Sequence, residues 1–360
     1  MTSAFEFGQQ DASPLAVSPS QAFTFSGRGS EYFRIWIVNL LLSIITLGIY
    51  SAWAKVRRLR YFYSNTAVAG TSFDYHGNPV AILKGRIIAV VLLVAYNFAF
   101  QVNALVGFIV MVAFAVAIPW LIWRSLQFKM YNSSYRGIRF GFKGNAKTAY
   151  VVYLLLPVLT VLTLYFLTPF THQRIKRFQH SEARFGSTHF SFDGSVGSFY
   201  KTYLLGLGIC IAGLVVILFG FGSTLTVLAH GGIASATAGL VFSLILMGFV
   251  IYAWLFLMYP LFLTLLQNLI WNHTRLGEHR FTSQMRWGRM MFITFTNILA
   301  IICTLGLFTP FAQIRSMRYR IESMTLLPAS NLDEFVADAE AHGSATSEGM
   351  ADLLDFDMSL

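Results

Sequence analysis

The chain has 360 residues, of which 56% are hydrophobic and only 12% are charged. Soluble domains carry about 25% charged residues, so this composition excludes an ordinary soluble globular protein. The formal net charge is +10 at pH 7. Because the basic residues cluster beside long uncharged stretches, we interpret this charge as the Lys and Arg excess of cytoplasmic membrane loops, and not as a nucleic-acid site.

The two ends of the chain differ from the rest. Residues 1–20 are polar and have neither a basic start nor an apolar core, so we expect a disordered tail and not a signal peptide. Residues 326–360 carry no Lys or Arg and hold eight of the 16 acidic residues. We expect a second disordered tail there, either solvated or docked on a basic surface or a partner. Residues 21–325 are predicted to form a membrane domain built from repeats.

The first repeated unit, unit A, is an apolar segment that ends in a basic helix. It occurs three times, as "TLGIYSAWAKVRRLRY" from Thr46, "TLYFLTPFTHQRIKRF" from Thr163 and "TLGLFTPFAQIRSMRY" from Thr304. Glycine or proline interrupts each copy near the same place. Two interpretations stay open: unit A enters the membrane part-way and returns as an interfacial helix, or it is an ordinary span kinked at proline.

The second repeated unit, unit B, is a long uncharged stretch. Residues 87–123 contain no charge, and 37 residues in one helix would run about 55 Å, against a hydrocarbon core of about 30 Å. We therefore predict a transmembrane hairpin that turns at Gln101–Asn103. Residues 203–272 show the same pattern, so the order of units is A-B-A-B-A.

A short alternating motif, Phe-x-aromatic-x-Gly, recurs at the unit boundaries. It begins at Phe23, Phe73, Phe140 and Phe190, and His279–Gln284 is a degenerate fifth copy. Alternate side chains share one face of a strand, so both rings of each motif lie on one side. Four copies predict short strands that pair with one another outside the membrane.

Together these elements predict a mostly α-helical fold. We expect a polytopic helical membrane protein with an A-B-A-B-A internal repeat, transmembrane hairpins, re-entrant or kinked helices and short cytoplasmic β-strands. Five loops rich in Lys and Arg favour the cytoplasm as the location of both termini.

The residues from Phe25 to Thr66, "FSGRGSEYFRIWIVNLLLSIITLGIYSAWAKVRRLRYFYSNT", carry a family resemblance. This stretch resembles the opening of the bacterial YjgN-like family of inner-membrane proteins, which is catalogued as a domain of unknown function. The likeness covers roughly residues 21–325. It implies a multi-pass location in the bacterial inner membrane, and it implies no activity and no catalytic residue.

Six arginines stand in matched register in the three copies of unit A. We predict that they form an anion-binding ring at the headgroup level, because paired guanidinium groups bind a phosphate or carboxylate well. The alternative is that they only snorkel and orient the protein. The residues are Arg57, Arg60, Arg174, Arg177, Arg315 and Arg318.

Uncharged polar residues interrupt the apolar segments of unit A. They are candidates to line a cavity, although hydrogen bonds between helices would also explain them. The residues are Asn39, Thr46, Thr163, Asn297 and Thr304. No Asp or Glu lies within an apolar segment, which argues against ion-coupled transport through an intramembrane carboxylate.

Enzyme signatures are weak throughout the chain. The histidines lack metal-ligand spacing and no nucleophile stands beside a base, so we expect no enzyme, no catalytic residue, no metal and no cofactor. Two functions stay open: permeation or export of a small or amphiphilic solute, and a membrane scaffold or anionic-lipid-binding assembly factor. The expected partners are membrane lipids, anionic ones in particular, and an unknown solute or protein, but not nucleic acid. The oligomeric state stays open.

Overall fold

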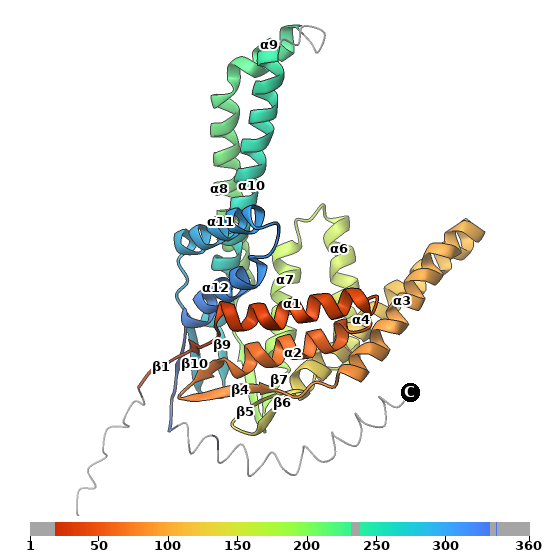
Figure 1. The fold of residues 1–360 in the computed structure, drawn as a ribbon, viewed down its shortest axis with the longest axis vertical. Coiled ribbons are helices and arrows are strands. Elements are labelled where there is room, and N and C mark those ends of the chain that lie inside the picture. The colour runs from red at the N-terminus through yellow and green to blue at the C-terminus, as the bar shows by residue number, and fades with distance from the viewer. Residues whose placement is uncertain (1–18, 232–237, 332–335, 337–360) are drawn as a thin grey trace, which may run out of the picture.

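The computed structural model describes residues 19–231, 238–331 and 336 (Figure 1). The expected N-terminal tail lies outside these residues apart from its last two positions. The same holds for most of the expected acidic tail, of which residues 326–331 and Val336 are described.

Each copy of unit A folds as a short helical hairpin. In all three copies a helical stretch of 17 residues, a turn of five residues and a helix of 14 residues follow one another. The chain turns back at the interruption and does not continue as a kinked span. The helices are α1 (Gly29–Ile45) with α2 (Ser51–Ser64), then α5 (Ala146–Tyr150), the π-helical η1 (Val151–Leu155) and α6 (Leu156–Leu162) with α7 (Thr168–Ser181), and finally α11 (Trp287–Cys303) with α12 (Thr309–Glu322).

Each copy of unit B folds as a long helical hairpin. The first pairs α3 (Pro79–Val102) with α4 (Ala104–Tyr131), and the second pairs α8 (Val196–Gly220) with α10 (Ala238–Asn272), with α9 (Gly222–Gly231) between them. The first turn lies at Asn103, within the predicted interval, where the Asn103 side chain accepts a hydrogen bond from the Leu105 amide at 2.9 Å. Among the described residues, α3, α4, α8 and α10 are the four helices long and apolar enough to span a membrane.

A β-hairpin connects each helical hairpin to the next one along the chain. The strands are β1 (Gln21–Ala22), β2 (Thr24–Phe25), β3 (Thr66–Val68), β4 (Thr71–Tyr75), β5 (Ser133–Tyr135), β6 (Ile138–Phe142), β7 (Ala183–Phe185), β8 (Thr188–Phe192), β9 (Thr274–Leu276), β10 (His279–Ser283) and β11 (Met324–Leu327). The first two tight turns have φ of +47° and +74° at Ala69 and Gly70, and +49° and +82° at Arg136 and Gly137. Two positive φ values are the requirement of a two-residue turn that matches strand twist, and glycine meets it readily at the second position.

These strands form one antiparallel sheet that closes on itself. In the described part of the chain eleven strands follow the order β1-β11-β10-β9-β8-β7-β6-β5-β4-β3-β2. Its two ends, β1 and β2, are separated only by Phe23, whose amide donates to the Met324 carbonyl at 3.0 Å. The sheet is therefore a small barrel, and the pairing of β1 with β11 joins the beginning of the chain to the end.

The expected fold class is corrected by this barrel. A mostly α-helical protein with a few short cytoplasmic strands is wrong, because the strands form a continuous near-closed sheet of eleven. Each strand has only two to five residues and is a weak signal alone. Nine of these strands pair with two neighbours, and β1 and β2 continue into each other through Phe23, so the sheet lacks the open edges that make short isolated strands unstable.

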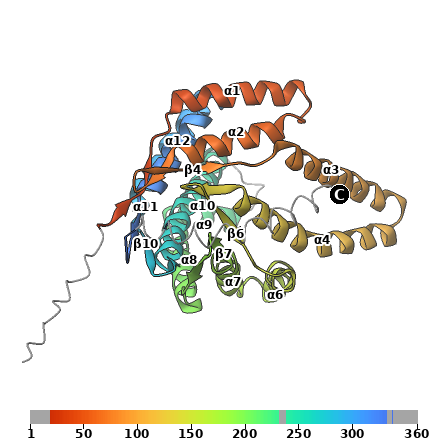
Figure 2. The ribbon, with the colours of Figure 1, turned by 90° about the horizontal axis from the view of Figure 1, so that it is seen from below.

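The helical hairpins surround the barrel in chain order. Seen from below, the hairpins lie on successive sides of the strands, α1 with α2 on one side, α3 with α4 on the next and α6 with α7 on the one after (Figure 2). Each hairpin contacts the next, through α2 with α3, α4 with α5, α7 with α8, α10 with α11, and α12 with α1. The contact between α12 and α1 closes this ring, as β11 with β1 closes the barrel.

Candidate functional site

Five phenylalanines meet at the barrel axis. Phe73, Phe140, Phe190 and Phe281 each come from a β-hairpin, and Phe23 lies between β1 and β2. Neighbouring ring centroids lie 6.4 Å apart for Phe23 with Phe73, 6.3 Å for Phe73 with Phe140, and 6.4 Å for Phe140 with Phe190. The circle closes at 6.2 Å between Phe190 and Phe281, and at 6.4 Å between Phe281 and Phe23. The first ring of each motif thus belongs to one pentagon, which we call the Phe pentagon.

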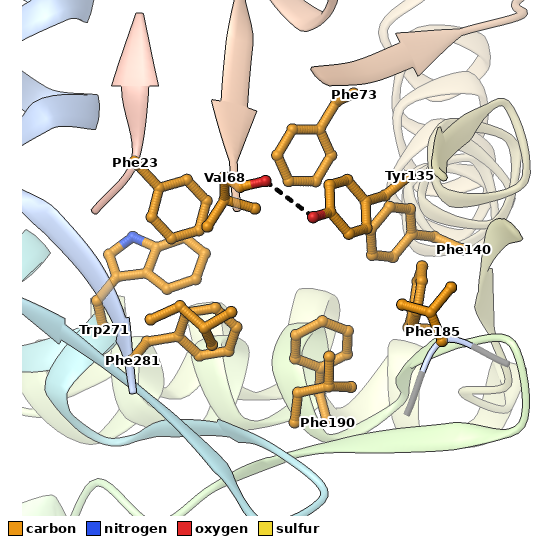
Figure 3. Close-up of a pocket in the computed structure, with 12 residues that line it drawn as sticks. Phe23, Val68, Phe73, Tyr135, Phe140, Phe185, Phe190, Trp271 and Phe281 are labelled. Carbon is orange, nitrogen blue, oxygen red and sulfur yellow. Dashed lines mark hydrogen bonds between the residues drawn. The ribbon is translucent and has the colours of Figure 1, made fainter. Parts of the chain in front are cut away.

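A second layer of side chains comes from the neighbouring strand that pairs with the strand of each phenylalanine. Its five members are Val68, Tyr135, Phe185, Leu276 and Leu326. The Tyr135 hydroxyl donates to the Val68 carbonyl at 2.9 Å, as the dashed line in Figure 3 shows. This hydrogen bond satisfies the polar atom of an otherwise apolar layer.

The two layers enclose a cavity of about 170 Å³. Twelve side chains line it, all of them apolar or aromatic, and Figure 3 shows the labelled ones around a central space. Besides the ten of the two layers, they are Trp271 at the end of α10 and Val336 from the C-terminal part. An apolar cavity of this size stays free of water, because a buried water needs two to four polar partners.

The second ring of each motif packs on the glycine of the same motif. A Cβ atom built on Gly27, Gly77, Gly144 or Gly194 would come within 2.7 Å of the ring of Phe25, Tyr75, Phe142 or Phe192, respectively. Glycine is therefore required because a larger residue would clash with the ring, and not because the backbone adopts a conformation that favours glycine.

The degenerate fifth copy lacks both the second ring and the glycine, so its β-hairpin is held by other contacts. Ser283 stands in place of the second ring and Met285 in place of the glycine. Asn268 accepts hydrogen bonds from the Ser283 hydroxyl at 2.8 Å and from the Met285 amide at 2.9 Å. Asn272 accepts one from the Ser283 amide at 2.6 Å. Polar contacts to α10 thus replace ring packing in this β-hairpin.

The first arginine of each unit A copy points into its own hairpin. Arg315 donates to the buried Asn297 Oδ1 at 2.8 Å and to Thr296 at 3.1 Å. In the first copy Arg57 donates to Tyr50 at 3.0 Å and lies 3.5 Å from the buried Asn39 Oδ1. The middle copy has leucine where the others have asparagine, and there Arg174 lies over the Phe170 ring, 4.9 Å from its centroid.

The second arginine of each copy lies at the barrel end of the hairpin. Arg318 donates to the Gly27 carbonyl at 2.8 Å, and Arg60 reaches the Tyr75 carbonyl at 3.5 Å. Both carbonyls belong to Phe-x-aromatic-x-Gly motifs. Arg177 is exposed.

The six predicted anion-binding residues therefore lie on three separate hairpins. The third hairpin brings two of them together, where Arg315 and Arg318 line a cavity of about 220 Å³ with Arg289 and Glu322. Arg289 is a residue that the matched registers could not reveal, since the first copy has Glu31 at that position. Binding of anions by these arginines stays a prediction.

The predicted polar liners fall into two groups. Asn39 and Asn297 are buried against arginines, as described. Thr46, Thr163 and Thr304 lie at the hairpin tips, and their hydroxyls donate to the carbonyls of Leu42, Leu159 and Ala300 four residues earlier, at 2.7–2.9 Å. Their observed contacts are those of turn residues, and a role in lining a cavity stays a prediction.

Each tip presents one leucine almost entirely to the surroundings. Leu47, Leu164 and Leu305 are 94%, 89% and 95% exposed, and their φ values are +49°, +50° and +51°. The sequence repeat contains this feature, because each leucine follows the threonine directly, but only the structure shows that it forms the outermost point of a hairpin. A fully exposed leucine at three matched tips indicates contact with lipid.

One histidine at the barrel end of α7 has an altered pKa. His180 packs against Trp271 and Phe192 and lies 3.2 Å from the Thr274 hydroxyl. Burial, with a smaller contribution from Lys176, lowers the pKa of His180 to about 4. His180 is therefore neutral at physiological pH and acts as a packing residue under the barrel.

Comparison with known proteins agrees with this architecture of membrane helices. The family described as "Bacterial protein of unknown function (DUF898)" matches residues 20–353, and the chain belongs to that family. Proteins named "Inner membrane protein YjgN" are similar to it, at 31% identity over 147 residues in Salmonella typhimurium strain LT2, and over 159 residues at 32% in Escherichia coli O157:H7 and 33% in Escherichia coli strain K12. These matches cover 41–42% of this chain and 37–39% of the relatives. No solved structure matches.

The resemblance to the YjgN-like family is thus confirmed. With four apolar helices long enough to span a bilayer and relatives named for the inner membrane, the chain is a membrane protein whose surroundings are lipid.

Proposed function

We propose that the protein is a membrane scaffold that binds anionic lipid headgroups with its short hairpins. The observation that carries this proposal is the pairing of an exposed apolar tip with an arginine whose partners are uncharged. The hydrogen-bond partners of Arg57 and Arg315 within the described residues are Asn39, Tyr50, Asn297 and Thr296. Each guanidinium has five donors, so capacity for a phosphate remains.

The dimensions of the short hairpins support this proposal. A helix of 17 residues is about 25 Å long, which is less than the hydrocarbon core of about 30 Å, and the chain then turns back. The first arginine stands ten residues after the tip leucine in every copy. At 1.5 Å per residue this places it roughly 10–15 Å from the tip, so a tip at the bilayer centre puts the arginine near the headgroups.

A charge-preserving double substitution tests the proposal. Arg57→Lys with Arg315→Lys keeps the charge but removes the planar fork that makes two parallel bonds to a phosphate. We expect the purified variant to lose most of its preference for nanodiscs containing phosphatidylglycerol over phosphatidylcholine. Arg275→Lys is the matched control, because Arg275 pairs with Asp193 at 2.7 Å in the barrel. An unchanged preference in the double variant would show that the arginines serve only as topological anchors.

Permeation or export of a small or amphiphilic solute is the second candidate. The closed ring of helical hairpins around one axis favours it. Solute flux through vesicles that contain the purified protein separates the two candidates, since a scaffold produces none above empty vesicles.

We further propose a multi-pass location in the inner membrane with both termini in the cytoplasm. Gln21 pairs with Leu326, so both ends of the described chain leave the barrel side by side, which supports a common side. A cysteine at the exposed Ser187, with Cys210 and Cys303 replaced, should resist an impermeant thiol reagent in intact cells. Labelling from outside would reverse the orientation.

A further inference from the structure

We propose that the barrel interior is a binding site for a hydrocarbon group, the end of an unbranched alkyl chain. The site is the cavity of about 170 Å³ between the Phe pentagon and the second layer. It is separate from the arginines of the short hairpins, so the proposal stands or falls independently of headgroup binding.

An empty cavity of this size destabilises the fold. Side chains around a void lose packing contacts, and protein cores are otherwise filled to high density. Water does not fill this void, because all twelve lining residues are apolar or aromatic and the Tyr135 hydroxyl already donates to the Val68 carbonyl. An apolar occupant is the remaining way to recover the lost contacts.

The cavity also matches the end of an alkyl chain in size and shape. An apolar cavity of about 150 Å³ holds a benzene molecule, so this one has room for a chain end of a few carbons. Five side chains in each of two stacked layers form a passage along the barrel axis, and a linear chain fits such a passage better than a branched one. The lining carries no charge, so the polar end of the ligand stays outside.

The order of elements identifies the two ends of the site. Trp271 lies at the end where helices meet the barrel, 5.5 Å from the Phe281 centroid, and it also packs on His180. β11 runs from α12 toward the other end, where the Ala329 amide donates to His279 at 3.1 Å. Val336 follows a few residues later in the chain, packs against the cluster and lines the cavity. The ligand enters where Val336 lies, and the Val336 side chain competes with it.

Photo-crosslinking of the full chain in nanodiscs tests the proposal. The probe is an unbranched alkyl chain with a terminal diazirine, used once as a free alcohol and once as a phospholipid acyl chain. We expect mass spectrometry to find crosslinks on peptides that hold the Phe pentagon and the second layer. Comparison of the two probes distinguishes a soluble amphiphile from a membrane lipid as the source.

A cavity-filling variant provides the control. Val68→Phe places at this position the residue that Phe185 supplies in another β-hairpin, so the barrel can accept it. We expect crosslinking of barrel peptides to fall at least tenfold, while Val90→Phe on the exposed face of α3 leaves it unchanged. Leu276→Phe is the second cavity-filling variant, used if Val68→Phe does not fold.

Val336→Ala completes the test by opening the mouth. Stronger crosslinking than in the unsubstituted chain supports the site and identifies Val336 as the competitor. Two results overturn the proposal: equal labelling of the barrel in the cavity-filling variants, or no labelling of the barrel in either the unsubstituted chain or Val336→Ala.

Discussion

The barrel and the short helical hairpins repeat the same sequence units, yet they use the repeats in opposite ways. In the barrel, equivalent residues converge: five phenylalanines, four of them from β-hairpins and Phe23 from the first strands, have ring centroids within 6.4 Å of their neighbours. In the hairpins, equivalent residues diverge, and Arg57, Arg174 and Arg315 each find partners within their own hairpin.

The difference follows from geometry. A closed sheet directs one face of every strand toward a common axis, so equal register produces a shared core. Helical hairpins that surround the barrel point away from that axis, so equal register produces separate copies of one local contact. A matched position in a repeat therefore predicts a shared site only when the element that carries it faces the symmetry axis.

Removal of one member of the Phe pentagon should have the largest effect. Phe281 is buried and contacts Phe23, Phe190 and Trp271, so Phe281→Ala should lower the free energy of unfolding by about 3–5 kcal/mol. Denaturant unfolding of the purified protein in one detergent measures it. Phe292→Ala, on an exposed ring of α11, should cost less than about 1 kcal/mol. An equal loss of unfolding free energy in both variants would contradict the idea that the barrel phenylalanines form a shared core and the hairpin residues do not.

Acid should cause the second-largest loss of stability, through His180 at the barrel end of α7. His180 has a pKa of about 4 in the folded protein and about 6.5 when unfolded, so the unfolded state binds more protons between these values. The stabilising contribution is complete above pH 6.5 and is lost as pH falls to 4, by up to about 3 kcal/mol. Comparison of unfolding at pH 7.5 and 4.5 measures this loss, and the part due to His180 should disappear in His180→Gln. If His180→Gln leaves the difference in stability between the two pH values unchanged, the acid sensitivity comes from other residues.

A methyl group under the second ring should have a moderate effect. Gly144→Ala brings a Cβ within 2.7 Å of Phe142 and 2.7 Å of Phe178, and such overpacking costs about 1–3 kcal/mol. Gly288→Ala in α11 is the matched control, since no heavy atom lies within 4 Å of its added Cβ. We expect this control to be neutral or slightly stabilised in thermal unfolding. A tolerated Gly144→Ala would mean that the ring can move, and that the motif glycine has another cause.

Part of the barrel could be predicted from sequence, because alternation is a local signal. The motifs at Phe23, Phe73, Phe140 and Phe190 correctly indicated strands with neighbouring rings. Their preceding strands, such as Thr66–Val68, have three residues and no alternation to detect. The pairing of Gln21 with Leu326 joins positions about three hundred residues apart, and closure of a sheet is not encoded in any single segment.

The candidate site was predictable to a similar extent. The arginine registers predicted an anion-binding ring, and that stays a prediction. They did not reveal the partner of Arg315, which lies 18 residues earlier on an antiparallel helix. A search for pairs with the same spacing in two copies, Asn39 with Arg57 and Asn297 with Arg315, would have found it. The cavity in the barrel had no such signal, since its lining is ordinary apolar residues whose meeting depends on closure.

The smallest expected effect concerns these asparagine–arginine pairs. It tests whether the equivalent arginines of the helical hairpins make separate contacts of different strength. Arg315 donates to Asn297 at 2.8 Å, whereas Arg57 lies 3.5 Å from Asn39, which is at the limit of a hydrogen bond. A double-mutant cycle with Asn297→Ala and Arg315→Ala should yield a coupling of about 1–2 kcal/mol, because the bond involves a charged donor and a buried acceptor.

The same cycle with Asn39→Ala and Arg57→Ala should yield about 0.5 kcal/mol or less. The middle copy is the matched control, since Leu156 offers Arg174 no acceptor, and Leu156→Ala with Arg174→Ala should show no coupling within error. Unfolding of all variants in one detergent gives the three values. Equal coupling in the first and third copies would mean that both arginines make the same bond in solution, and no coupling in the third would free Arg315 for lipid alone.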